Sequence, residues 1–161
     1  MKLSKLSNYL NNQVTMLALL LLILVPTFWT MLKPGIFSMQ DLHIFRLYEF
    51  NKCISDLQLP CRWTPDSAFE YGEPLFNFYG QLPYLLGEPF ILMGFSIIDT
   101  LKLLFVLSIV LSALTMFLLA KQIWGNNWGA VLAAVIYSYA PYRAVDIYVR
   151  GALPESLAFI F

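Results

Sequence analysis

Two short polar segments of this sequence carry the kinds of side chain that catalyse group transfer and bind phosphate. The first segment opens with Asp41, His43, Arg46 and Glu49, which lie within three turns if the segment is helical. Residues three apart face one another on a helix, so a carboxylate here can act as a base beside a phosphate-binding arginine. The alternative is a capping aspartate followed by surface ion pairs, which are common on helices.

The second polar segment covers residues 142–155 and lies between two apolar runs. Its charged residues are Arg143, Asp146, Arg150 and Glu155. Two arginines at a membrane surface suit a lipid phosphate or pyrophosphate. A short charged loop that only fixes the direction of membrane crossing explains the same residues equally well.

The remaining candidates for chemistry are a lone histidine and two cysteines. His43 together with Cys53 and Cys61 does not supply a usual zinc ligand set. The two cysteines are as compatible with two free thiols as with a disulfide in an oxidising compartment. The sequence contains no nucleophile elbow, phosphate-binding glycine loop or dinucleotide fingerprint.

The composition places the chain in the membrane class. It is 59% hydrophobic and 12% charged, whereas soluble domains are about 45–50% apolar and about 25% charged. Ten basic and ten acidic side chains balance, so no basic excess suggests nucleic acid. The expected partner is therefore the lipid bilayer.

Apolar runs predict membrane spans at about 14–32, 101–121 and 128–141, with the start of a further span at 156. A cleaved signal peptide is the alternative for 14–32, but no small-residue cleavage site follows that run. Lys2 and Lys5 predict a cytoplasmic N-terminus. We expect residues 1–161 to form one membrane domain and to be the N-terminal part of a longer protein.

The loops between these spans must position the polar segments. Residues 33–100 and 142–155 form the expected external loops, with a helix predicted from Ser38 to about Ser55 and irregular chain at 59–74. Residues 75–98 predict one or two helices at the membrane interface, because their uncharged run is short for a span. The alternative is a crossing that buries Glu88, which is costly, and it would put the two polar segments on opposite sides.

Three motifs together resemble a known family: Asp41-x-His43-x-x-Arg46, then Pro60-x-Arg62-Trp63-x-Pro65-Asp66 leading to Tyr71-Gly72-x-Pro74-Leu75-Phe76-Asn77-Phe78-Tyr79, and Ala140-Pro141-Tyr142-Arg143-x-x-Asp146-x-Tyr148-x-Arg150-Gly151-Ala152-x-x-Glu155. They resemble large bacterial membrane proteins named for a 6-pyruvoyl-tetrahydropterin-synthase-related region, which are similar to GT-C glycosyltransferases. The resemblance covers about residues 14–161. The chain departs from it at Glu70 and Glu73, where relatives more often have Gly-Tyr-Gly-Tyr-Pro.

The resemblance implies an all-α, polytopic membrane protein with a GT-C-like N-terminal portion and a large first external loop. It implies a hexosyltransferase of the plasma membrane that moves a sugar from a polyprenyl-phosphate donor to an envelope acceptor. The acidic residue that GT-C enzymes place in this loop falls on Asp41, with His43 and Arg46 as further catalytic candidates. The candidates for binding substrate and lipid phosphate are Arg62, Arg143, Asp146, Arg150 and Glu155.

Two points stay open in this interpretation. A divalent metal at Asp41 is compatible with the resemblance, but nothing in the sequence requires one. The protein can also be non-catalytic, either a subunit of a flippase or transporter for a lipid-linked carrier or a scaffold of envelope assembly. Polar residues near mid-bilayer would favour a transporter, and the 103–120 run contains only Ser108, Ser112 and Thr115 as polar groups.

Overall fold

The computed structural model describes residues 12–36 and 41–161. Within these ranges the regular elements are helices, and strand-like pairing is limited to one bridge between Thr64 and Glu73. The all-α prediction is therefore confirmed. In chain order the elements are α2 (Gln13–Phe28), η1 (Trp29–Leu32), α3 (Asp41–Ser55), α4 (Ser67–Glu70), α5 (Leu75–Phe78), α6 (Leu82–Leu92), α7 (Ile97–Trp124), α8 (Asn127–Ser138), α9 (Pro141–Val145), η2 (Asp146–Arg150) and α10 (Leu153–Ala158).

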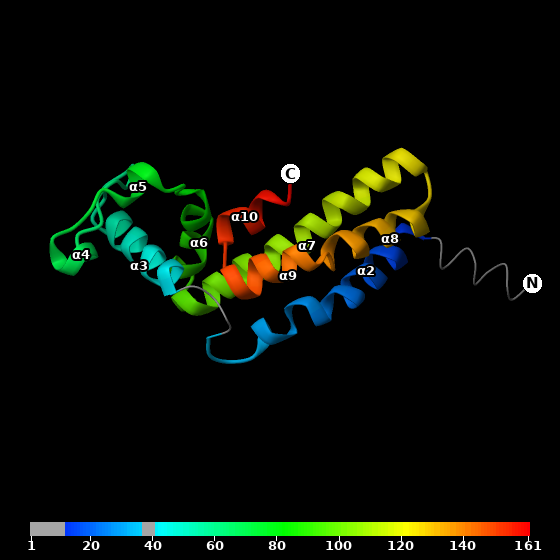
Figure 1. The fold of residues 1–161 in the computed structure, drawn as a ribbon, viewed down its shortest axis with the longest axis horizontal. Coiled ribbons are helices and arrows are strands. Elements are labelled where there is room, and N and C mark those ends of the chain that lie inside the picture. The colour runs from blue at the N-terminus through cyan, green and yellow to red at the C-terminus, as the bar shows by residue number, and fades with distance from the viewer. Residues whose placement is uncertain (1–11, 37–40) are drawn as a thin grey trace, which may run out of the picture.

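Helices α2, α7 and α8 lie side by side in one bundle, as Figure 1 shows. Gln13–Leu32 and Ile97–Trp124 are long and apolar enough to cross a membrane. These two helices contain the spans predicted at 14–32 and 101–121. Small side chains are buried on α7 and α8 and let the two backbones approach closely: Ala113, Ala120, Ala130 and Ala134.

The third predicted span is only partly matched by α8. This helix has 12 residues, about 18 Å at 1.5 Å per residue, whereas the hydrocarbon core is about 30 Å thick. Its end follows from the sequence, because Pro141 lacks a backbone donor and starts a new helix, α9. At the position of the further span expected from residue 156, the structure has the six-residue helix α10.

Helices α3 to α6 form a separate layer at one end of the bundle (Figure 1). Helix α3 begins at Asp41 and ends at Ser55, so the helix predicted from Ser38 to about Ser55 is present, while Ser38 itself falls outside the described residues. A cluster of aromatic rings joins three of the helices: Phe50 of α3, Phe76 of α5 and Tyr84 of α6 lie 5.4–6.2 Å apart between ring centroids. This cluster is the core of the layer.

The chain between α3 and α5 is irregular, as predicted, and is closed by a disulfide. Cys53 and Cys61 are bonded, with their Cα atoms 5.9 Å apart. Further along, Gly72 has φ of +75° and lies directly under the indole of Trp63. A glycine is needed there because a left-handed backbone and the ring leave no room for a Cβ atom.

Residues 75–98 contain two short helices, α5 and α6, in agreement with the prediction of one or two. Glu88 of α6 is buried, and its Oε1 accepts a hydrogen bond of 2.6 Å from Asn51 Nδ2 of α3. The carboxylate is therefore held between two helices of the layer. The opposite face of α6 carries only exposed apolar side chains, which include Leu82, Leu85, Leu86 and Leu92.

Candidate functional site

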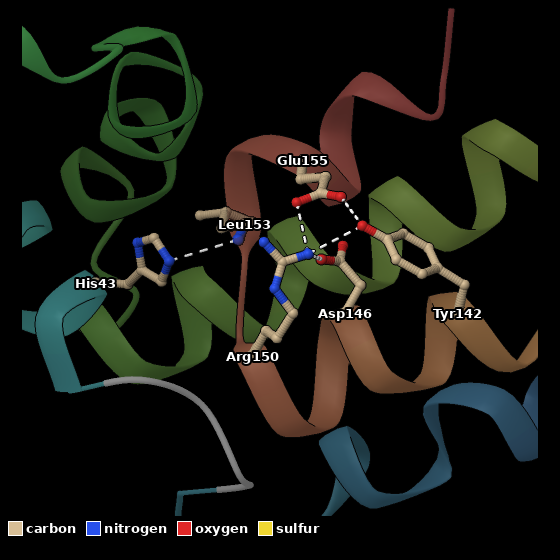
Figure 2. Close-up of polar contacts among 6 residues, drawn as sticks. All are labelled: His43, Tyr142, Asp146, Arg150, Leu153 and Glu155. Atoms are coloured by element: carbon tan, nitrogen blue, oxygen red, sulfur yellow. Dashed lines mark hydrogen bonds and ion pairs between the residues drawn. The ribbon is translucent and has the colours of Figure 1, made fainter.

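The second polar segment folds into a tight helical reversal. Helix α9 continues into the π-helical turn η2, which ends at Gly151 with φ of +58°. Helix α10 then starts at Leu153 and runs back over η2, as Figure 2 shows. The left-handed glycine therefore brings the residues after it back onto those before it.

Four side chains of this segment form what we call the polar cluster: Tyr142, Asp146, Arg150 and Glu155. Arg150 Nη1 lies 3.1 Å from Asp146 Oδ1, 2.9 Å from Glu155 Oε2 and 3.0 Å from Tyr142 Oη. The Tyr142 hydroxyl also donates a hydrogen bond to Glu155 Oε1. Figure 2 shows the arginine at the centre of these contacts. The cluster joins a cation to two carboxylates and a phenol.

The two carboxylates of the polar cluster have different environments. Asp146 is fully buried, whereas the side chains of Arg150 and Glu155 are 48% and 37% exposed. Burial and the nearby charge of Glu155 raise the pKa of Asp146 to about 6. The hydrogen bond from Tyr142 and the charge of Arg150 lower the pKa of Glu155. At neutral pH Glu155 is therefore firmly ionised, while Asp146 titrates close to the working pH.

Arg143, the other predicted phosphate ligand of this segment, points elsewhere. Its side chain is buried, and Nη1 donates a 2.7 Å hydrogen bond to Ser112 Oγ of α7. Its guanidinium lies over the rings of Phe159 and Tyr137, at 4.7 Å and 5.3 Å from their centroids. The structure thus separates the two arginines: Arg143 ties α9 to the bundle, and Arg150 faces solvent.

His43 connects the first polar segment to the second. Its ring is buried, with Nδ1 3.0 Å from the Tyr84 hydroxyl and Nε2 3.4 Å from the backbone nitrogen of Leu153. Burial, and secondarily the charge of Arg46, lower the pKa of His43 to about 4. The imidazole is therefore neutral at pH 7, and both of its nitrogens face protein groups.

The other sequence candidates lie in different settings. Asp41 is the first residue of α3, two positions before His43, and its side chain is outside the described residues. Arg46 stacks on the ring of Tyr79, 3.6 Å from its centroid. Arg62 is exposed on the loop after the disulfide, and the described structure gives it no contact with the polar cluster. His43 is thus the candidate of the first segment that touches the second.

Tyr142, Tyr84 and Ser112 belong to these contacts but were not among the residues predicted from sequence. Tyr142 had a usable signal, because it precedes Asp146 and Arg150 by one and two helical turns. Tyr84 and Ser112 had none, since each meets its partner from a distant part of the chain. Hydroxyl groups on apolar helices are typical of helix packing as well.

An apolar groove of about 410 Å³ lies between α2 and the α8–α9 region. Thr27, Thr30, Tyr139 and Tyr148 supply polar atoms at its walls, and the Tyr148 hydroxyl donates to the Thr27 carbonyl at 2.5 Å. Among the residues that the structure describes, no three histidine, cysteine or acidic side chains gather in a way that would hold a metal ion. The polar cluster is therefore the strongest candidate site in the described chain.

Comparisons of the chain with protein-family models, with curated proteins and with solved structures found no match.

Proposed function

We propose that this protein is a multi-spanning, GT-C-like glycosyltransferase that transfers a sugar from a polyprenyl-phosphate donor to an acceptor of the cell envelope. One observation carries the proposal: the hydrogen bond between His43 Nε2 and Leu153 N joins the helix that starts at Asp41 to the turn that holds Arg150. Two polar segments 110 residues apart in sequence thus meet at one end of the helical bundle.

The proposed transfer needs a base and a cation. The acceptor hydroxyl attacks the anomeric carbon of the sugar, its proton passes to a carboxylate, and the bond to the lipid phosphate breaks with both electrons going to the phosphate. Asp41 is the proposed base. Arg150, which is half exposed, is the proposed ligand of the leaving phosphate. Asp146 and Glu155 hold the guanidinium in place.

The arrangement of helices supports placing both polar segments on the outer side of the membrane. Helix α2 with η1 and helix α7 are the proposed spans, and the α3–α6 layer lies beyond one of their ends (Figure 1). Lys102 Nζ donates 2.7 Å to the Lys33 carbonyl, so the end of the first span and the start of the next lie at one level. The proposed crossing back consists of α8 and ends near Pro141, before the external segment 142–155.

Helix α6 is proposed to lie on the membrane surface. Leu82, Leu85, Leu86 and Leu92 are 45–74% exposed. Together with the exposed Pro89, they recur at intervals of three and four residues along one face. An exposed apolar stripe of this kind suits the boundary between headgroups and acyl chains. The buried face of the same helix contacts α3 and α7, so the layer would rest on the bilayer next to the spans.

Sugar transfer is tested with the purified protein in liposomes and a radiolabelled polyprenyl-phosphate sugar. Asp41→Asn and Arg150→Gln should each lower the transfer rate by about a hundredfold or more, the usual contribution of a base or a charge-stabilising group. Asp56→Asn, an exposed aspartate just after α3, is the matched control and should transfer normally. Full activity of Asp41→Asn would remove Asp41 from the role of base. Movement of the lipid-linked sugar between leaflets without transfer would favour the flippase.

The proposed topology has a separate test. Ala144 is exposed in α9, and a cysteine there should react with a membrane-impermeant thiol reagent added outside intact cells. Cys53 and Cys61 form the disulfide and do not compete for the reagent. A cysteine at Gln122 should react only after permeabilisation. The opposite pattern of labelling would exclude an external site.

A further inference from the structure

We infer that His43 is a positioning residue: it accepts a hydrogen bond from the backbone N–H of Leu153 and so fixes the turn that carries Arg150 and Glu155. The role rests on the proposed function only in that Arg150 is assigned to the leaving phosphate there. It differs from a catalytic role, because the histidine acts on the substrate through the turn and does not touch it.

The direction of the hydrogen bond follows from the donor. A backbone N–H can only donate, so the inference assigns a lone pair to the Nε2 atom that faces Leu153 N at 3.4 Å, in preference to a proton directed at the Gly151 carbonyl. In a neutral imidazole the proton is then on Nδ1, which donates to the Tyr84 hydroxyl 3.0 Å away. The Tyr84 hydroxyl can accept from Nδ1–H, so its contact is compatible with the form of His43 that accepts from Leu153.

Burial strengthens the hydrogen bonds that His43 makes with Tyr84 and Leu153. His43 is 1% exposed, and both Tyr84 and Leu153 are fully buried, so water does not compete for these groups. The Leu153 N–H is shared, since it also lies 3.0 Å from the Gly151 carbonyl. A contact within the turn alone cannot fix the position of the turn against the α3–α6 layer. His43 provides a hydrogen-bonded contact of that kind, beside the packing of α10 on α6 and α7.

The hydrogen bond from Leu153 to His43 lies close in sequence to Arg150 and Glu155. Only Gly151 and Ala152 separate Arg150 from Leu153, and Glu155 lies two residues beyond Leu153. Gly151 has φ of +58°, a conformation that a glycine leaves easily once its surroundings loosen. Loss of the histidine contact therefore lets the turn move, and with it Arg150 and Glu155, whose ion pair is 2.9 Å long.

Three variants of the purified protein in liposomes test the role. His43→Phe keeps the ring volume but has no acceptor, His43→Gln offers an amide oxygen near the position of Nε2, and Tyr84→Phe removes the group that orients the ring. Hydrogen exchange of the backbone amides at 151–153 and 155 measures how readily the turn opens and needs no enzymatic activity. It should become about tenfold faster in His43→Phe, less so in Tyr84→Phe, and stay near wild type in His43→Gln.

The transfer assay supplies the second readout. His43→Phe should raise the KM for the polyprenyl-phosphate sugar about tenfold, and His43→Gln should restore most of it, which a general packing defect would not do. Nitrogen NMR of the labelled histidine should show the lone-pair resonance at Nε2. Unchanged exchange at 151–153 and 155 in His43→Phe, or a proton on Nε2, would overturn the inference. Altered exchange without any sugar transfer in wild type would uphold it and refute the proposed function instead.

Discussion

Replacing Asp146 by asparagine should stabilise the protein, although Asp146 belongs to the polar cluster. The carboxylate is fully buried and lies beside the like charge of Glu155, and these two causes raise its pKa from 3.8 to about 6. Asparagine has the same shape, keeps an oxygen facing Arg150 and can donate an N–H to Glu155 as a protonated acid would. The variant therefore removes the cost of ionising a buried acid.

The size of this gain follows from the pKa. Each pKa unit corresponds to about 1.4 kcal/mol, so a rise of about two units sets an upper limit of about 3 kcal/mol at neutral pH. Solvent around the half-exposed Arg150 and Glu155 screens these charges, so we expect a gain of about 1–2 kcal/mol. Between pH 4 and 6 the unfolded acid is ionised while the folded acid keeps its proton, so rising pH destabilises only the wild type.

The assay is unfolding of the detergent-solubilised protein at a series of pH values, with Asp56→Asn as a control that should match the wild type. For Asp146→Asn the gain should be near zero at pH 4, grow up to pH 6 and stay level above it. A gain of this size corresponds to an increase in Tm of about 2–8 °C for a chain of this length. An Asp146→Asn variant less stable than the wild type at pH 7, or a gain that does not depend on pH, would refute the reasoning.

Two further predictions concern the loop between α3 and α5. Gly72→Ala should lower the free energy of unfolding by about 1–3 kcal/mol, because φ is +75° and the new Cβ would lie 2.5 Å from Trp63 Nε1. Gly94→Ala is the control and should lower it less, because φ is +95° there but the space is open. Equal losses of stability in the two variants, measured by denaturant unfolding, would contradict the steric argument. Reducing the Cys53–Cys61 disulfide should lower stability by about 2–3 kcal/mol, which unfolding with and without reductant measures; an unchanged midpoint would show that the loop is held by other contacts.

Much of the fold was predictable because hydropathy and helical spacing are local signals. The apolar runs at 14–32 and 101–121 predicted the two long helices, and the polar spacing from Asp41 predicted α3. The length of α8 was less predictable, because the run to residue 141 stays apolar while the helix ends at Ser138, ahead of Pro141. Composition gives the environment of a segment, whereas a proline decides where its helix stops.

The candidate site was predictable only where its contacts are local. The pairing of Asp146 with Arg150 follows from a spacing of one helical turn. The contact between His43 and Leu153 depends on how the α3–α6 layer packs on the bundle, and no periodicity carries that information. The two arginines of residues 142–155 looked equivalent in sequence, yet burial assigned Arg143 to helix packing and left Arg150 exposed.

The length of α7 links the site to the thickness of the bilayer. As a proposed span, the 28-residue helix α7 is about 42 Å long, whereas the hydrocarbon core is about 30 Å thick, so it would project from the membrane or tilt within it. Helices α3 and α6 both pack on α7. A thinner or thicker bilayer would change the tilt of α7. Helix α3 would move with it, and the hydrogen bond between His43 and Leu153 would transmit this movement to the turn. Lipid chain length would then act as a regulator of the proposed site.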